Sequence, residues 1–276
     1  MYISMNNTQN IENKRNRSII SNGVNWIGVY TMVRREVERT MRVVVQTVLA
    51  PVISATLYIF IFGFVVGSRI ENIVGVPYIT FVFPGILMLS IINASFSSSS
   101  SSLYFARFVK GIEEILLAPF SYVEMIFGYM FGAVLRALIV AFLILVVGLF
   151  FGAVTLVNPI GFVLYVIAVS GIFSLLGMLV ALWADGFEQL TILNTFIITP
   201  FTYLGGIFYS VTMLPQSAQL LTHINPFFYF VDGIRSSMIG VSEANPGVGL
   251  LVIGGLLVGL AALVTYLFKI GWKIRA

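Results

Sequence analysis

The residues that could do chemistry are sparse in this chain, and several of them gather at 104–119, YFARFVKGIEEILLAP. The apolar residues of this stretch recur at the spacing of one helix face, and Lys110 can pair with carboxylates three and four positions further on. Pro119 would end such a helix. We expect a short charged helix that rests one face on an apolar surface and offers Arg107, Lys110 and Glu114 to a soluble partner. The alternative is an ordinary solvated loop helix.

Catalytic chemistry has few candidate residues. The chain has no cysteine and a single histidine, His223, which excludes thiolate chemistry and clusters of histidine ligands. No lysine is preceded by the glycine of a phosphate-binding G-x-x-x-x-G-K-[ST] loop. All 11 acidic residues fall in predicted tails or loops, so no carboxylate is expected in mid-membrane. We therefore expect no enzyme activity in this chain, no cofactor and no metal.

The composition is that of an integral membrane protein. Hydrophobic residues make up 59% of the chain and charged residues 9%, and the mean hydropathy is +1.01. Soluble domains carry about 25% charged residues. The pI near 9.4 does not indicate nucleic acid, because the basic residues stand at the ends of apolar segments and form no single patch.

Six apolar segments are long enough to cross a bilayer, which predicts an all-α membrane fold of six transmembrane helices. They are 43–66, 78–104, 125–152, 160–183, 190–208 and 248–268. Arg136 is the only charge inside a predicted span, and it either snorkels to the headgroups, which we favour, or contacts a substrate. The serines at 97–102 either pack helices closely, which we favour, or line a path for a substrate.

The N-terminal region has two parts. Residues 1–23 are polar and asparagine-rich, which predicts a disordered cytosolic tail. In 24–42 a Trp-led apolar stripe opposes a basic face, which predicts an interfacial helix lying flat on the membrane. Most lysines and arginines fall on one side of the predicted spans, so the positive-inside rule places both termini in the cytosol.

The region 210–246 is too apolar for a solvated loop and too long for a turn. We expect a re-entrant hairpin that breaks before Pro226 and closes the outer side, with its aromatic residues wedged against the spans and Asp232 pairing with Arg235. A looped-out aromatic cap is the alternative. The residues assigned to this outer gate are Asn225, Pro226, Phe227, Phe228, Asp232 and Arg235.

Three motifs carry a resemblance to a known family: ITPFTYLGGIFYSVTMLP at 198–215, LTHINPFFYFVDGIR at 221–235 and IEEILLAP at 112–119. With them the chain resembles ABC-2 type transport permeases, particularly the bacterial YadH-like branch, over nearly everything after residue 24. The resemblance implies one ABC-2 transmembrane domain at 24–276, of the type V exporter-like fold, in a bacterial cytoplasmic (inner) membrane. It implies a homodimer of the permease that binds two copies of a separate ABC ATPase subunit.

The resemblance also implies roles for residues. The stretch 112–119 would be the coupling helix that docks on the ATPase, and 24–42 the interfacial connecting helix. The residues assigned to coupling are Arg107, Lys110, Ile112, Glu113, Glu114, Leu116 and Pro119. The implied function is the permease subunit of an ATP-driven exporter for a drug, lipid or glycoconjugate. A non-transporting scaffold or sensor subunit is the alternative, and a secondary transporter is weakened by the missing carboxylates in the spans.

Overall fold

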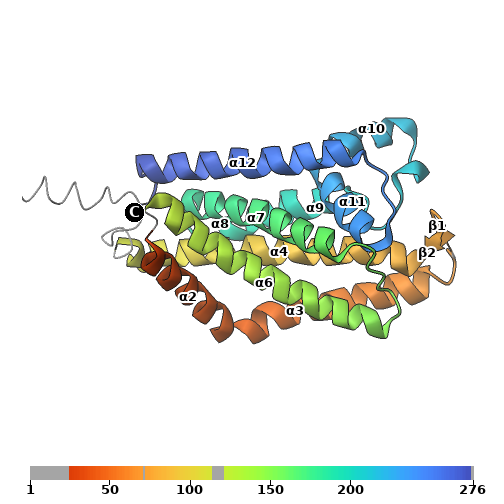
Figure 1. The fold of residues 1–276 in the computed structure, drawn as a ribbon, viewed down its shortest axis with the longest axis horizontal. Coiled ribbons are helices and arrows are strands. Elements are labelled where there is room, and N and C mark those ends of the chain that lie inside the picture. The colour runs from red at the N-terminus through yellow and green to blue at the C-terminus, as the bar shows by residue number, and fades with distance from the viewer. Residues whose placement is uncertain (1–24, 71, 114–120, 275–276) are drawn as a thin grey trace, which may run out of the picture.

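The computed structural model describes residues 25–70, 72–113 and 121–274, so the predicted tail at 1–23 lies outside the described residues. Five of the described helices are long and apolar enough to cross a membrane (Figure 1). They are α3 (Val44–Phe60) with its π-helical continuation Ile61–Val66, α4 (Tyr78–Phe108), α6 (Tyr122–Phe150), α7 (Pro159–Trp183) and α12 (Pro246–Ile270). These five correspond to five of the six predicted spans.

The span predicted at 190–208 is not a single long helix. It consists of α8 (Gln189–Leu193), a π-helical segment (Asn194–Ile198) and α9 (Thr199–Tyr203), with five residues in each. At 1.5 Å per residue these segments reach about 22 Å, less than the roughly 30 Å of a hydrocarbon core. A bundle of six full-length spans is therefore not confirmed.

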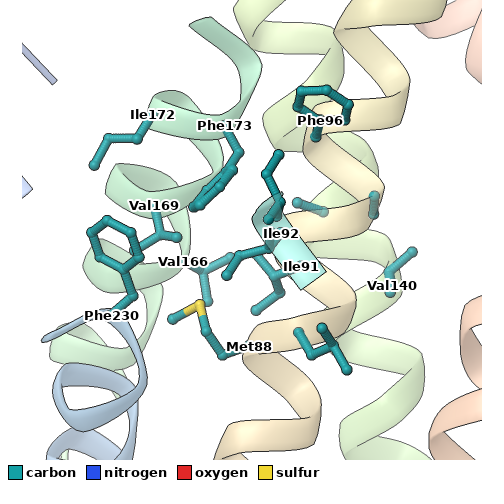
Figure 2. Packing of buried hydrophobic residues seen from close by; sticks show 14 of the residues in the cluster. Met88, Ile91, Ile92, Phe96, Val140, Val166, Val169, Ile172, Phe173 and Phe230 are labelled. Carbon is teal, nitrogen blue, oxygen red and sulfur yellow. The ribbon is translucent and has the colours of Figure 1, made fainter. Parts of the chain in front are cut away.

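Helix α4 forms the centre of the molecule. In its most apolar window 89% of the residues are buried, against 17% for the windows of α3 and of α12. Figure 1 shows α3 and α12 on opposite sides of the bundle, with α4 running between them. Figure 2 shows the contacts from close by: Met88, Ile91, Ile92 and Phe96 of α4 face Val166, Val169 and Phe173 of α7.

The predicted serine run packs helices closely, as we favoured. Ser99 Oγ of α4 donates a hydrogen bond of 2.6 Å to the carbonyl oxygen of Ser174 on α7. A Cβ added to Gly177 of α7 would lie 2.6 Å from the carbonyl oxygen of Phe96. Only a glycine allows α7 to approach the backbone of α4 this closely, and the small serines complete the contact.

Three helices begin with the same pair of residues, Asn followed by Pro. They are α7 after Asn158, α11 (Pro226–Ile239) after Asn225 and α12 after Asn245. In each case the Asn Oδ1 accepts a hydrogen bond from a backbone N–H of the first turn, at 2.9, 3.1 and 2.9 Å. Proline suits the next position because its missing N–H would have no partner inside the helix.

The region between α9 and α12 contains short helices. A 3₁₀ turn (Val211–Met213) and α10 (Gln216–Ile224) precede α11, and Gly240 ends α11 with φ 73°. The break predicted before Pro226 is present, with extended backbone at Asn225. Strands β1 (Asn72–Ile73) and β2 (Val76–Pro77) pair in an antiparallel hairpin ahead of α4.

Helix α2 (Trp26–Arg42) buries one face against the bundle, and its flat position on a membrane stays a prediction. Its buried residues are Gly28, Met32, Glu36 and Thr40, one every fourth position. This face packs along α6, since a Cβ on Gly128 would lie 2.8 Å from Met32 Cβ and one on Gly132 would lie 2.7 Å from Glu36 Cβ. The aromatic residues predicted to face the membrane, Trp26 and Tyr30, are 74% and 65% exposed.

Candidate functional site

The charged stretch at 104–119 is not one helix. Helix α4 continues to Phe108, the chain turns at Val109 and Lys110, and helical backbone resumes at Gly111. Lys110 has a φ of 57°, in the left-handed region that rarely suits a residue with a side chain. The prediction that one helix starts at Tyr104 is therefore wrong, because the turn at Val109 and Lys110 separates α4 from the helical backbone at 111–113.

Arg107 is buried, which contradicts its predicted place on an exposed face. Its Nη1 donates hydrogen bonds to the carbonyl oxygens of Ala181 and Ala184, the second at 3.2 Å. Lys273 Nζ donates to the carbonyl oxygen of Trp183 at 3.2 Å and contacts the Asp185 carboxylate at 3.0 Å. Two cationic side chains from other parts of the chain thus donate hydrogen bonds to the carbonyl groups at the C-terminal end of α7. Positive charge is favoured there by the helix dipole.

The remaining coupling residues divide into three groups. Lys110 and Glu113 are exposed, and Ile112 is 2% exposed. Glu114, Leu116 and Pro119 lie outside the described residues. The described part therefore presents Lys110 and Glu113 beside an end of α4 that is held to α7.

Arg235 of α11 connects to the opposite end of α4. It is fully buried, with Nη2 donating to the carbonyl oxygen of Gly206 at 2.6 Å and Nε donating to that of Phe81 at 3.3 Å. Its Nη1 lies 3.7 Å from Glu243 Oε2. Burial lowers the pKa of Arg235 to about 10, and the nearby carboxylates of Glu243 and Asp232 oppose the shift. The guanidinium therefore keeps its charge at neutral pH.

The predicted pairing of Asp232 with Arg235 is wrong. Asp232 instead holds the loop after α11, because its carboxylate accepts hydrogen bonds from Ser242 Oγ and from the backbone N–H of Glu243, both at 2.7 Å. Glu243 also accepts from Ser210 Oγ and from the Val211 N–H. Sequence reasoning missed Glu243. The residue that could have indicated this contact is Gly240, because it ends α11 and lets the chain that carries Glu243 fold back over the helix.

The aromatic residues of α11 pack against the spans, as expected. Phe227 and Phe230 form a triad with Phe173 of α7, with ring centroids 5.5 to 5.7 Å apart. Phe228 is fully buried. Asn225 Nδ2 donates to the carbonyl oxygen of Phe201 at 2.7 Å, so the break before α11 is tied to α9.

Arg136 does not reach a surface. Its side chain on α6 is 3% exposed, and it lies within electrostatic range of Glu36 and Arg39 of α2. Glu36 itself is 2% exposed, and it lies on α2, which is not one of the five long apolar helices. Sequence reasoning missed a signal for this packing. Gly128, Gly132 and Arg136 recur every four residues on α6, and the buried residues of α2 recur with the same spacing.

Comparison with known proteins matches residues 28–239 to the family model described as ABC-2 type transporter. The inner membrane transport permease YadH of Escherichia coli (strain K12) is 38% identical over 218 residues, which cover 79% of this chain and 85% of that protein. Nodulation protein J of Rhizobium meliloti (strain 1021) is 29% identical over 229 residues, covering 82% and 86%. The resemblance found in the sequence motifs is thereby confirmed. A matching family model over most of the chain, the close relative and five apolar helices together show that this multi-pass membrane protein belongs to the ABC-2 type transporter family.

Proposed function

We propose that this chain is the permease subunit of an ATP-driven exporter, and that a separate ATPase docks beside the end of α4 that carries Lys110 and Glu113. Permeases of this family work with an ABC ATPase partner in general. The substrate would be a drug, a lipid or a glycoconjugate, and it would be transported out of the cytoplasm. Two permease copies and two ATPase copies would form the complex, with both termini of the permease in the cytosol.

The observation that carries this proposal is the position of α4 between the two sites. One end of α4 is attached to α7 through Arg107 and precedes the exposed Lys110 and Glu113. The other end is attached to α11 through the contacts of Arg235 with Phe81. The helix has 31 residues, about 46 Å at 1.5 Å per residue, and its middle is buried. A displacement imposed at the docking end would therefore be carried toward the outer end along one continuous helix, which contains Pro84 close to the Phe81 contact.

The outer end would act as the gate. Within the segment Asn225 to Arg235, Arg235 donates one buried hydrogen bond to Phe81 at the start of α4 and another to Gly206, which follows α9. We propose that α11 and its Asn225–Pro226 break form the re-entrant hairpin that opens for release of the substrate. The exposed apolar side chains of α10, Leu220, Leu221 and Ile224, support a position at the membrane surface.

The decisive experiment reconstitutes the purified permease with its ATPase in proteoliposomes and compares the wild type with the double variant Glu113→Arg, Glu114→Arg. We expect the variant to fold, because Glu113 is exposed and exposed charges contribute little to stability, and to lose ATPase binding or to hydrolyse ATP without transport. Glu38→Arg is the matched control, since it reverses an exposed carboxylate on α2. Normal assembly and normal export by the double variant would refute the docking role.

A further inference from the structure

A cluster of buried polar side chains lies where α2, α4 and α6 meet, with Ser98 and Ser102 near the C-terminal end of α4. Ser102 Oγ of α4 donates to the two carboxylate oxygens of Glu36 at 2.8 and 2.9 Å. Arg39 Nη2 lies 3.0 Å from Glu36 Oε2 and donates to the carbonyl oxygen of Ser98 at 3.1 Å. The side chain of Arg39 is 27% exposed, so it stands at the edge of the cluster.

Arg136 of α6 has no such partner. Arg136 is only 3% exposed, and its Nε has no hydrogen-bond acceptor among the described residues. Gly132, one turn earlier, lies against Glu36, and Gly128 lies against Met32. Continued by one more turn on both helices, this four-residue step predicts that Arg136 lies opposite Thr40.

Two more polar groups at this junction lack a partner in the described part of the chain. They are Thr40 Oγ1 on α2 and Tyr129 Oη on α6, in side chains that are 0% and 1% exposed. About nine in ten buried polar groups in proteins, or more, have a hydrogen-bond partner. Three unpartnered groups on two adjoining helices therefore indicate that a ligand belongs between them.

The charge at the junction identifies the kind of ligand. Arg39 and Arg136 oppose a single carboxylate, Glu36, which leaves one positive charge uncompensated inside the protein. A water molecule would satisfy hydrogen bonds and would leave that charge unchanged. An anion would satisfy both the donors and the charge, and the guanidinium group binds phosphate oxygens especially well.

We propose that the junction of α2, α4 and α6 binds a phosphate group, with Arg136 and Arg39 as its counter-charges and Tyr129 and Thr40 as hydroxyl donors. The first turns of α2 expose Trp26, Ile27 and Tyr30, which are typical of a membrane interface, and Arg39 at the edge of the cluster is 27% exposed, so the headgroup of an anionic phospholipid can approach through Arg39. A free phosphate ion offers the same chemistry. The proposal concerns binding alone and does not depend on the direction of transport or on the ATPase.

The test measures the midpoint of thermal unfolding of the purified full-length permease in a neutral detergent. The probes are dihexanoyl phosphatidylglycerol and inorganic phosphate, each titrated separately. Dihexanoyl phosphatidylcholine and sodium chloride of equal ionic strength are the controls. We expect a saturable rise of the midpoint with at least one probe. A rise with the lipid alone assigns the site to a headgroup, and a rise with phosphate assigns it to the free ion.

The variant Arg136→Gln should require about tenfold more of the effective probe, since it loses a charge-assisted contact. Arg42→Gln is the matched control, because it removes an exposed arginine from the C-terminal end of α2, near Thr40. This variant should respond to the probes like the wild type. If Arg136→Gln does not fold, Tyr129→Phe removes only one hydroxyl group and should weaken binding about threefold. No saturable rise beyond the controls with either probe, or undiminished binding in the variants, would overturn the proposal.

Discussion

The guanidinium carbon of Arg235 lies 3.9 Å from the centre of the Phe81 ring, so a charged group of α11 rests on an aromatic ring at the start of α4. Cation–π contacts of this kind gain strength when the cation has lost its water. Together with two backbone carbonyls and Glu243, the ring replaces the water that Arg235 gives up on burial.

Replacing this arginine should therefore be costly. We expect Arg235→Gln to lower the free energy of unfolding by about 3 kcal/mol, because it leaves the Glu243 carboxylate without its buried cation. Adding Glu243→Gln should recover part of the loss. Arg69→Gln, at an exposed arginine, should change it by less than about 0.5 kcal/mol. Thermal or denaturant unfolding of the purified variants measures these effects, and equal stability of Arg235→Gln and Arg69→Gln would contradict the interpretation.

The gate hypothesis predicts that transport and stability separate in variants of α11. Phe227→Leu loosens the triad with Phe173 and should reduce stability modestly while changing export or basal ATP hydrolysis by the assembled complex. Phe142→Leu is the control, since that phenylalanine is 64% exposed on α6. Export and the amount of folded protein are measured on the same samples. If export falls only in proportion to folded protein, α11 is a structural plug.

The contact between α4 and α7 predicts a difference between two glycines. Gly177→Ala would place a Cβ 2.6 Å from the carbonyl oxygen of Phe96, so we expect a loss of about 1–3 kcal/mol from overpacking. Gly254 of α12 has nothing within 4 Å of its added Cβ, so Gly254→Ala should be neutral or stabilising. Unfolding midpoints of the two variants settle the comparison, and equal midpoints would show that α7 can move away from α4.

The proposed orientation is checked by thiol labelling, for which the cysteine-free chain needs no prior substitution. Ser68→Cys introduces a thiol at an exposed position just after the π-helical segment Ile61–Val66, and Glu188→Cys introduces one beyond the end of α7. In intact cells a membrane-impermeant reagent should label Ser68→Cys and leave Glu188→Cys unlabelled. Labelling of Glu188→Cys alone would reverse the orientation and place Lys110 and Glu113 outside the cell.

The long apolar helices were predictable because composition alone determines them. The predicted limits of α7 and α12 differ from the observed ones by at most two residues, since Asn–Pro pairs and a glycine mark their ends. The segment 189–203 was less predictable, because its hydrophobicity is that of a span while its backbone is divided by a π-helical stretch. Periodicity reports which residues are apolar and contains no information on such a change in hydrogen bonding.

The partners of buried charges could not be read from local sequence. Helical spacing suggested Asp232 for Arg235, and the structure pairs Arg235 with Glu243, on a loop that folds back. Arg107 looked solvent-facing because the sequence does not show that α7 ends beside it. Contacts between distant segments decide these cases, and they depend on how the helices pack.

The three Asn–Pro pairs have a consequence for the synthesis of the chain. The groups that cap α7, α11 and α12 are supplied within three residues of each asparagine, by the N–H groups of Gly161, Phe227 and Gly247. None of these starts requires a partner from elsewhere in the protein. Each helix can therefore acquire its boundary as soon as its first turn has left the ribosome, before the helices that will surround it have been made.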